Sequence, residues 1–481
     1  MKLIFEKGAP GRRGASVPEC DVPEEHGLPD SLLRSEDAAL PEVSELEVVR
    51  HFTELSRRNF GVDCGFYPLG SCTMKYNPKM AETVGDYDGF RELHPLLPQL
   101  PGGEALTQGA LRVIHELERH LCEITGMARF TMQPLAGSHG ELTGIMLIAA
   151  FHRARGQKKS TIIVPDSAHG TNPASAAIGG FEVVPVPSDE NGFMGLDAFR
   201  DALDDRVAGV MLTCPNTLGL FNPHVKEIAD LTHEAGGLMY YDGANLNAIL
   251  GKSRPGDLGF DVVHLNLHKT FGTPHGGGGP GAGPVGVAER LVEYLPVSTI
   301  EKEPDGSYHL RYDHERTIGY IAPFYGNFAV LVRAYAYILA LGREGLIDVA
   351  EHAVLNANYV LARLRDDYEV PFGDRCMHEC VLSAVRQKKN DVSALDIAKG
   401  LIDRGFHPPT VYFPLIVKEA MMIEPTETEC KETLDAFCEA MIELARLAES
   451  DPEALHRAPV NAPVTRIDEY GAACELDLAL L

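Results

Sequence analysis

The stretch VAGVMLTCPNTLGLFNPHVKEIADLTHEAGGLMYYDGANLN, residues 207–247, predicts a complete strand–helix–strand unit. Apolar runs at 207–213 and 237–242 predict two buried strands, and a helix is expected between them at 225–235. Strands joined by such a crossover lie parallel, because the helix carries the chain back to the start of the next strand. Both runs are apolar throughout rather than alternating, which indicates a sheet covered on both faces.

The same alternation of strands and helices continues on both sides of this unit. Further strands are predicted at 130–133, 161–164 and 262–266, and a helix is predicted from Glu141 to Ala154. We therefore expect an α/β fold with a mostly parallel central sheet. Ligands of such sheets collect beyond the carboxyl ends of the strands, which is where the functional residues are expected.

The chain has 481 residues, more than one hydrophobic core normally supports. Residues 1–100 are rich in Pro and Gly and predict an N-terminal extended arm or cap. We expect a large ligand-binding domain at 101–330, and a smaller C-terminal α/β domain with a tail at 331–481. In the smaller domain, strands are predicted at 380–386 and 421–426, and helices at 392–405 and 431–448.

Composition excludes several classes of partner. The formal net charge is −26, from 43 basic and 69 acidic side chains, so nucleic acid is not an expected partner. No apolar run approaches about 20 residues, so no membrane span is expected. The ten cysteines are scattered and no signal peptide is evident, which favours a cytoplasmic location. The cluster CMHEC at 376–380 lacks a second half, and no metal site is expected.

Two polar segments follow the first predicted strands. In QPLAGSHGE, 133–141, the small residues Ala136, Gly137 and Ser138 leave backbone N–H groups free at the start of a helix. Such an end suits a phosphate, and the alternative is a plain turn. In PDSAHGTNPAS, 165–175, the His169 imidazole either stacks on a flat ligand or is solvated, and Thr171 or Asn172 is expected to cap the next helix.

Two more polar segments follow the strands of the opening stretch. In TCPNTLG, 213–219, Asn216 and Thr217 either reach a ligand or form the turn itself. In YYDGANLN, 240–247, Asp242 follows apolar residues and is costly to bury unless it is paired. A protonated ring nitrogen would serve as its partner, and the alternative is a carboxylate that caps a loop.

The stretch LNLHKTFGTPHGGGGPGAGPVGV, 265–287, places Lys269 after an apolar strand and before a glycine-rich loop, with His268 as a further polar contact. A lysine in a partly desolvated cleft becomes nucleophilic toward aldehydes. The spacing of Gly281, Gly283 and Gly286 also matches a dinucleotide-binding loop. We reject that interpretation because no strand precedes the glycines, a proline interrupts them, and a strand rather than a helix is expected to follow.

Together AGSHGE, DSAHGTNPAS, YYDGANLN and LHKTFGTPHGGGGPG resemble the P-protein of the glycine cleavage system. GSCTMKYNP, 70–78, resembles another stretch of that family, and the resemblance extends from about residue 50 to the C-terminus. P-proteins occur as one long chain of two similar halves or as two separate subunits. This chain resembles the second subunit, which carries the cofactor lysine.

The resemblance implies the aspartate-aminotransferase-like fold, called fold type I, and pyridoxal 5′-phosphate as the cofactor. It implies that Lys269 binds the cofactor covalently, His169 stacks on its ring, and Asp242 pairs with its pyridine nitrogen. Asn245 would lie near the phenolic oxygen. The remaining expected contacts are Ala136, Gly137 and Ser138 at the phosphate, Asn216 and His268 elsewhere on the cofactor, and Cys72, Thr73, Lys75 and Thr171 on the substrate side.

The implied activity is decarboxylation of glycine, with transfer of the aminomethyl group to the lipoyl-lysine of H-protein and release of CO₂. The implied partners are glycine, lipoylated H-protein and P-protein subunit 1, with two copies of each subunit. The alternatives are another fold-type-I enzyme, hydroxymethyltransferase-like or desulfurase-like, and a non-catalytic assembly subunit of the same fold. The presence of Lys269, Asp242 and His169 together argues against the last of these.

GSCTMKYNP has two possible interpretations. Cys72 is either a redox partner for the lipoyl disulfide or part of a structural loop at the entrance, in which Lys75 attracts the glycine carboxylate. We favour the structural loop, because a single cysteine has no resolving partner.

Overall fold

The computed structural model describes residues 2–23, 27–36, 38–276 and 281–475. The chain divides into two compact units, one formed by 1–64 with 461–481 and the other by 65–460. The main helix of the first unit is α1 (Glu45–Arg58), and the Ser44 side chain caps it by accepting from the Glu47 N–H. Its short elements are η1 (Ile4–Glu6), η2 (Asp30–Leu32) and α16 (Glu469–Cys474).

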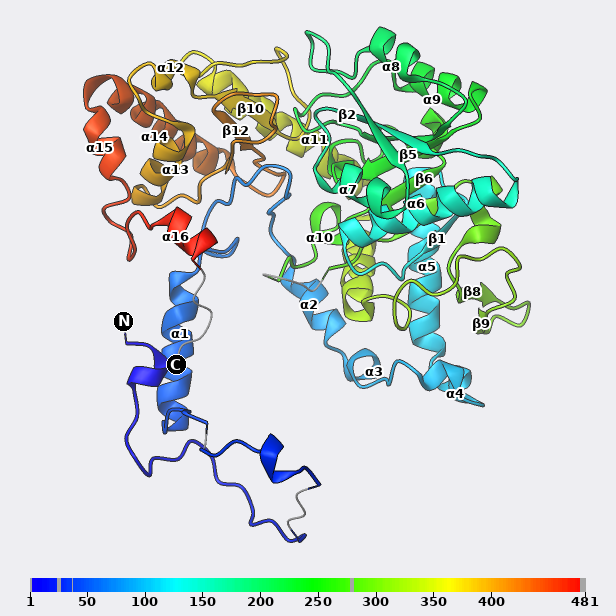
Figure 1. The fold of residues 1–481 in the computed structure, drawn as a ribbon, viewed down its shortest axis with the longest axis horizontal. Coiled ribbons are helices and arrows are strands. Elements are labelled where there is room, and N and C mark those ends of the chain that lie inside the picture. The colour runs from blue at the N-terminus through cyan, green and yellow to red at the C-terminus, as the bar shows by residue number, and fades with distance from the viewer. Residues whose placement is uncertain (1, 24–26, 37, 277–280, 476–481) are drawn as a thin grey trace. The chain divides into compact units, whose positions relative to one another are not determined.

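The second unit is built on a central sheet (Figure 1). Within the described ranges this sheet has seven strands, in the order β1-β7-β6-β5-β4-β2-β3. The strands are β1 (Arg129–Thr131), β2 (Thr161–Pro165), β3 (Glu182–Val186), β4 (Val207–Thr213), β5 (Leu238–Gly243), β6 (Val262–Leu265) and β7 (Val285–Val287). Strands β2 to β6 pair in parallel, and β7 pairs antiparallel with β6 and β1. The expected mostly parallel sheet is confirmed.

The register of the parallel strands brings three polar side chains together. Thr213 at the end of β4 pairs with Asp242 in β5, and Asp242 pairs with His264 in β6. All three lie near the carboxyl ends of their strands. The strand register therefore fixes the positions of these three side chains at the edge where functional residues are expected.

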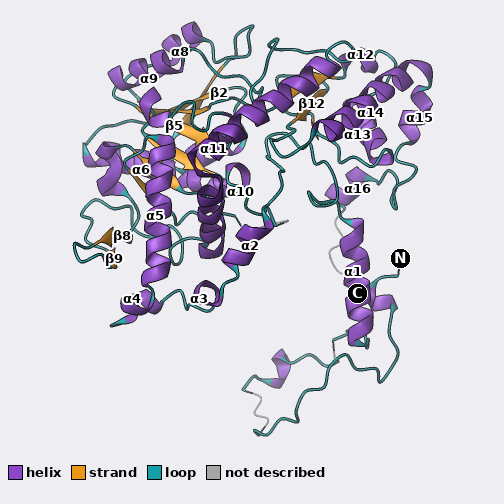
Figure 2. Ribbon diagram, turned by 180° about the vertical axis from the view of Figure 1, so that it is seen from behind, coloured by secondary structure: helices purple, strands orange, loops and turns teal. Residues whose placement is uncertain are grey.

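Helices cover both faces of the sheet, as the fully apolar strands predict (Figure 2). Alternate strand residues enter two separate cores: Val210, Tyr241 and Val263 pack in one, and Met211, Tyr240 and Val262 in the other. The first core includes residues of α5 and α9, and the second includes residues of α6. The helices of this region are α5 (Gln108–Thr125), α6 (Gly137–Ala154), α7 (Thr171–Ile178), α8 (Leu196–Ala202), α9 (Val225–Glu234) and α10 (Leu267–Thr270).

The main differences from the prediction are one unpredicted strand and several shifted element ends. In the expected smaller domain, the predicted strand 380–386 ends at Ser383, because a short helix begins at Val385. Strand β3 was not predicted, because this edge strand is only partly buried and contains Glu182 and Pro185. Strand β1 ends at Thr131 rather than 133. Helix α6 begins at Gly137 rather than Glu141, because the small residues form its first turn rather than a loop before it.

The remaining elements of this region lie around the sheet. A β-hairpin joins β8 (Thr299–Lys302) to β9 (Tyr308–Arg311). The short helices are α2 (Lys79–Gly85), α3 (Asp88–Arg91), η3 (Leu97–Gln99), α4 (Gly103–Leu106), η4 (Leu246–Ala248), η5 (Pro255–Leu258) and η6 (Glu289–Tyr294).

Helix α11 (Phe328–Leu364) leads from the sheet into a smaller lobe and is interrupted at Gly342, where φ is 63°. The lobe contains an antiparallel sheet of β10 (Cys380–Ser383), β12 (Ala420–Ile423) and β11 (Thr410–Val411). Around it lie α12 (Val385–Lys388), α13 (Ala394–Asp403), α14 (Lys431–Ser450) and α15 (Pro452–Arg457).

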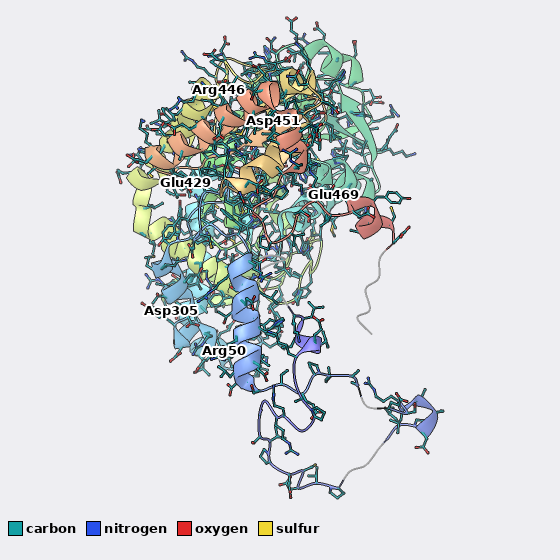
Figure 3. All side chains as sticks on the ribbon, turned by 90° about the vertical axis from the view of Figure 1, so that its left-hand side faces the viewer. Arg50, Asp305, Glu429, Arg446, Asp451 and Glu469 are labelled. Carbon is teal, nitrogen blue, oxygen red and sulfur yellow. The ribbon has the colours of Figure 1, made fainter. Side chains whose placement is uncertain are left out.

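The smaller lobe has its own apolar core, in which Leu382 and Phe437 pack. Arg446 of α14 is exposed, whereas Asp451 caps α15 by accepting from the Ala454 N–H; Figure 3 labels both charged residues. None of the helices in the described part of the chain is long and apolar enough to cross a membrane.

Candidate active site

A cavity of about 190 Å³ lies at the carboxyl ends of β4, β5 and β6. The start of α6 and the start of α7 also contribute to its wall. It is lined by Ser71, Gly137, Ser138, Glu141, His169, Thr171, Thr213, Thr217, Asp242, Ala244, Asn245, His264, Asn266 and Lys269. Three features of these walls define its chemistry: an amine, a buried carboxylate and a helix N-terminus.

Lys269 supplies the amine. It lies in α10, directly after β6, and its side chain is half-buried. Its Nζ donates to the backbone oxygen of Ser71 at 2.8 Å. The amine is thus held at the cavity by a neutral acceptor.

Asp242 supplies the carboxylate and is 3 % exposed. Its Oδ2 accepts from Asn172 Nδ2 at 3.1 Å and from Thr213 Oγ1 at 3.2 Å, and its Oδ1 accepts from the Ala244 N–H at 3.0 Å. Burial alone would raise the pKa of Asp242, but the His264 ring 3.4 Å away and the Ala244 N–H outweigh it and leave that pKa lowered. The lowered pKa favours the ionised form of this buried carboxylate at neutral pH.

Glu141 is a second buried carboxyl group at the cavity. Thr171 Oγ1 donates to its Oε1 at 2.9 Å and lies 2.8 Å from His169 Nδ1. Burial and the nearby Asp242 raise the pKa of Glu141 to about 7. The Thr171 backbone N–H also donates to His169 Nδ1 at 3.3 Å, so Thr171 holds the imidazole through both its backbone and its hydroxyl. Because Glu141 accepts from that hydroxyl, the carboxyl group is linked to the orientation of the ring.

The first turn of α6 supplies the helix N-terminus. Gly137 and Ser138 line the cavity, with Ala136 as the N-cap residue. The first N–H groups of a helix have no partner within it, so they are free to bind an anion. A Cβ at Gly137 would lie 2.6 Å from Asn266 Nδ2, so only glycine fits against this asparagine.

Two asparagine oxygens at the cavity are left without a partner. The Oδ1 atoms of Asn245 and Asn266 are buried and accept no hydrogen bond from the described residues. Their amide nitrogens are engaged with Pro215 O and His268 Nε2, respectively. Because unsatisfied buried oxygens are costly, these two indicate a polar ligand in the cavity.

Comparison with known proteins identifies the family. The family description "Glycine cleavage system P-protein" matches residues 25–311, and "Glycine dehydrogenase, C-terminal domain" matches 349–459. This chain belongs to the glycine cleavage system P-protein family.

Its relatives agree with this assignment. The chain is 59 % identical over 475 residues to the probable glycine dehydrogenase (decarboxylating) subunit 2 of Caldanaerobacter subterraneus subsp. tengcongensis, covering 98 % of this chain and 97 % of the relative. It is 58 % identical to the protein of the same name from Halalkalibacterium halodurans, covering 98 % and 96 %. The second-subunit form expected from the resemblance agrees with both names.

Solved structures confirm the expected fold. A crystal structure of glycine decarboxylase (P-protein) of the glycine cleavage system, in inhibitor-bound form, is similar with a TM-score of 0.71 and 21 % identity, covering 87 % of this chain and 93 % of that one. Alanine–glyoxylate aminotransferase from Nostoc sp. is similar with a TM-score of 0.56 and 15 % identity, covering 79 % and 95 %. At these identities the likeness extends to the fold alone.

The structure does not bring every predicted residue of this P-protein to the cavity. Asn216 instead holds a turn: its Nδ2 donates to Gly192 O at 2.8 Å, and its Oδ1 accepts from the N–H groups of Leu218 and Leu220 at 3.0 Å. His268 lies beside the cavity against Asn266, and burial lowers its pKa to about 3. The predicted cap of α7 was wrong: its N-cap is Gly170, because Thr171 and Asn172 bind the carboxyl groups described above.

The GSCTMKYNP segment of this P-protein reaches the cavity through Ser71. Lys75 is instead buried: its Nζ donates to Glu427 at 2.7 Å, to Thr270 O at 2.7 Å and to Tyr337 Oη at 3.1 Å. Burial raises the pKa of the Cys72 thiol to about 11, which keeps it protonated and weakens the redox interpretation. Thr73 binds Glu424.

Sequence reasoning missed several residues of the P-protein cavity. Thr213 and His264 are polar residues at or near the ends of apolar strands, the same signal that identified Asp242. Glu141 lies one helical turn after Gly137, so its position on α6 places it on the same side of that helix. Asn266 directly follows the apolar strand β6 and carries the same signal, whereas Ser71 and Asn172 had no local signal of this kind.

The CMHEC segment lies in the smaller lobe of the P-protein chain. Cys376 and Cys380 pack in the apolar core there. His378 and Glu379 approach Glu424, and single ligand atoms of these three lie within 4.8 Å of one another. The group could hold a metal by proximity alone, but the cysteines that suggested a site in the sequence do not belong to it. Residues 277–280 of the glycine-rich run lie outside the described residues.

Proposed function

We propose that this chain is the lysine-bearing subunit of a glycine-decarboxylating P-protein and that its cofactor is pyridoxal 5′-phosphate. The observation that carries the proposal is that Lys269, Asp242 and the N-terminus of α6 line one small cavity. An aldehyde, a ring nitrogen and a phosphate are what these three groups respectively bind. Family membership and the names of the relatives support glycine as the substrate.

The residues present fit pyridoxal phosphate. Lys269 would bind its aldehyde, Ala136, Gly137 and Ser138 would surround its phosphate, and His169 would stack on its ring. The partnerless oxygen of Asn245 would accept from the phenolic group. Asn172 and Thr213 hold the Asp242 carboxylate, so it would face the pyridine nitrogen with a fixed geometry.

When bound, the cofactor supplies an electron sink for the bond between the α-carbon and the carboxylate of glycine. Asp242 keeps a proton on the pyridine nitrogen, because its own pKa is lowered and it does not take that proton. Thr171 holds the His169 ring through two contacts at Nδ1, and Glu141 accepts from the Thr171 hydroxyl. The carboxylate and the oriented imidazole are therefore in place before the substrate arrives.

The overall reaction transfers an aminomethyl group. The bond from the glycine α-carbon to its carboxylate breaks and CO₂ leaves. The same carbon bonds to one sulfur of a lipoyl disulfide, the S–S bond breaks, and the other sulfur takes up a proton. The lipoyl group is expected on H-protein. Subunit 1 is expected as the companion chain, in an assembly with two copies of each of the two subunits.

The cysteines support a cytoplasmic location. All ten are free thiols, and four of them are exposed. Exposed thiols persist in a reducing environment. This observation supports the proposed cytoplasmic location.

Replacement of Lys269 tests the proposal. The assay is exchange of label between bicarbonate and the glycine carboxyl group, run with lipoylated H-protein and with candidate subunit 1. Lys269→Ala should abolish both the exchange and the visible absorbance of the lysine-bound cofactor. Lys389→Ala, at an exposed lysine of the smaller lobe, is the control and should leave both unchanged. Full exchange activity in Lys269→Ala would rule out the assignment.

The same preparation separates the rival enzymes. A hydroxymethyltransferase would consume serine with a folate acceptor, and a desulfurase would release sulfur from cysteine. Neither would exchange label between bicarbonate and glycine in a reaction that depends on H-protein.

A further inference from the structure

The Ser71–Thr73 turn has an unusual backbone. Ser71 has a φ of 64° and Thr73 has a φ of 51°. Both values lie in the left-handed region of the backbone, which residues other than glycine rarely adopt. A turn of this kind persists only where its surroundings hold it, and such turns cluster at functional sites. The contacts of Ser71 and Thr73 show what holds this turn and which atom it directs toward the cavity.

Two buried carboxyl groups of the smaller lobe hold the turn. Glu379 Oε2 accepts from the Ser71 N–H at 2.7 Å. Glu424 uses both oxygens: Oε2 accepts from the Thr73 N–H at 2.8 Å, and Oε1 accepts from Thr73 Oγ1 at 2.6 Å. Both glutamates are 0 % exposed.

The two glutamates flank one end of a strand pair. Glu379 precedes β10 and Glu424 follows β12, and Cys380 pairs with Ile423 between these strands. The sheet of the smaller lobe therefore sets the spacing of the two carboxyl groups. Each carboxyl group meets one N–H of the turn: Glu379 accepts from Ser71 and Glu424 accepts from Thr73.

The turn presents the Ser71 carbonyl oxygen to Lys269, whose Nζ donates to it at 2.8 Å. The segment that follows is tied to the same part of the large lobe. Lys75 Nζ donates to Thr270 O at 2.7 Å, and Asn77 Nδ2 donates to Gly272 O at 3.0 Å. The segment that contains the Ser71 acceptor is thus hydrogen-bonded to α10, the helix that carries the Lys269 amine, and to the residues after that helix.

The two glutamates hold the turn by hydrogen bonds rather than by charge. Burial raises the pKa of both Glu379 and Glu424, which favours their neutral forms, and the charge of Lys269 only opposes this rise. The position of the amine therefore rests on its hydrogen bond to the Ser71 carbonyl.

We propose that Glu379 and Glu424 are positioning residues that hold the Ser71 carbonyl as the acceptor for the Lys269 amine whenever that amine is not bonded to the cofactor. Glycine must displace this amine in order to bind the cofactor itself. An acceptor held ready for the released amine favours that exchange. The inference rests on the proposed function only in requiring that Lys269 binds the cofactor.

The decisive variant is Glu424→Gln. A carboxamide offers one acceptor oxygen where Glu424 uses two, so the two bonds that Thr73 donates cannot both persist: one is lost, or the hydroxyl must turn to accept from the amide –NH2. The matched control is Glu419→Gln in the same lobe, because Glu419 Oε2 accepts a backbone N–H of Ala394 at 2.7 Å and does not contact the turn.

The first measurement uses the cofactor-free protein and needs no catalysis. Acetic anhydride modifies free amines, and mass spectrometry gives the rate at Lys269 relative to exposed Lys389. We expect Glu424→Gln to speed modification of Lys269 at least about threefold, and Glu419→Gln to leave it unchanged. An unchanged rate in Glu424→Gln, or an equal rise in the control, overturns the proposal.

The second measurement uses the holoenzyme with its companion subunit. Glycine is titrated and the change in the visible spectrum is followed. We expect Glu424→Gln to need roughly tenfold more glycine for half of the change, as for loss of one hydrogen bond to a charged amine. A purely structural role would lower the melting temperature without moving this midpoint.

A second pair of variants covers the case in which Glu424→Gln does not fold. Thr73→Val removes only the hydroxyl donor to Glu424, and Thr73→Ser keeps it. The valine variant should show both effects at a smaller size, and the serine variant should resemble the wild type; identical behaviour of the two overturns the proposal. If the lysine-bound absorbance never forms in the wild-type protein, the proposed function fails, while the labelling result still tests the turn.

Discussion

Lys75 and Lys269 both lie at the short helix α10, and their amines have different partners: Lys269 belongs to the helix, and Lys75 contacts its last residue. Lys75 contacts the Thr270 carbonyl, and its side chain is 1 % exposed beside Glu427. Burial alone would lower the pKa of Lys75, but the Glu427 carboxylate outweighs it and raises that pKa. Lys269 faces a cavity, donates to a neutral carbonyl, and forms no ion pair within the described residues.

The difference between the two lysines shows how a fold separates structure from reactivity. A lysine paired permanently with a carboxylate stays protonated and cannot attack an aldehyde. Lys269 is held by the Ser71 carbonyl, so its amine is positioned without the carboxylate partner that Lys75 has. The sequence contains both beside polar neighbours, and only the partner of each amine distinguishes them.

The largest effect on stability is expected from Lys75→Met. It leaves Glu427 buried without its cation, which costs about 3–5 kcal/mol. Thermal unfolding should show a large loss of stability relative to the wild type. Lys269→Met should leave the melting temperature of the cofactor-free protein nearly unchanged. Equal melting temperatures for the two variants would break the comparison.

Neutralising the partner should restore part of the loss. In the double variant Lys75→Met with Glu427→Gln, no unpaired charge remains, so we expect recovery of about 1–3 kcal/mol relative to Lys75→Met alone. The measurement is a double-mutant cycle of thermal or urea unfolding. Strict additivity of the two single changes would show that Lys75 and Glu427 are not energetically coupled.

A smaller effect is expected at Glu141, the carboxyl group that faces the cavity of Lys269. Its pKa is raised to about 7 in the folded chain, so the stability it contributes is present at low pH and is lost as pH rises through about 7. Glu141→Gln should remove this loss. The free energy of unfolding of the cofactor-free proteins, measured by denaturant titration from pH 5.5 to pH 8.5, should therefore fall more for the wild type, by at most about 3 kcal/mol. Parallel curves would contradict the raised pKa.

The smallest effect is expected from Cys72→Ser. The thiol is protonated at neutral pH, because burial raises its pKa to about 11, and the side chain does not line the cavity. Turnover with lipoylated H-protein should stay within about twofold of the wild type. A loss of turnover with normal cofactor absorbance would restore the redox interpretation of this segment.

Much of the large lobe could be predicted from sequence. Apolar runs predicted the central parallel strands, and a polar residue after such a run predicted Asp242 and Lys269 at one sheet edge. The edge strand β3 was not predicted, because its half-exposed residues lack that apolar pattern. The roles of Asn216 and Lys75 were beyond sequence reasoning, because a polar side chain near a site gives no sign of whether it contacts the ligand or its own backbone.

The sequence by itself determined the layers, the edge of the sheet that carries the chemistry, and the lysine at its centre. These depend on burial and on the spacing of residues along single strands and helices, which are local properties. Only the tertiary structure decided which distant residues meet there: Ser71 with Lys269, 198 residues apart, and Thr73 with Glu424, 351 residues apart. Such contacts arise when loops close across lobes, and no local pattern of residues specifies their partners.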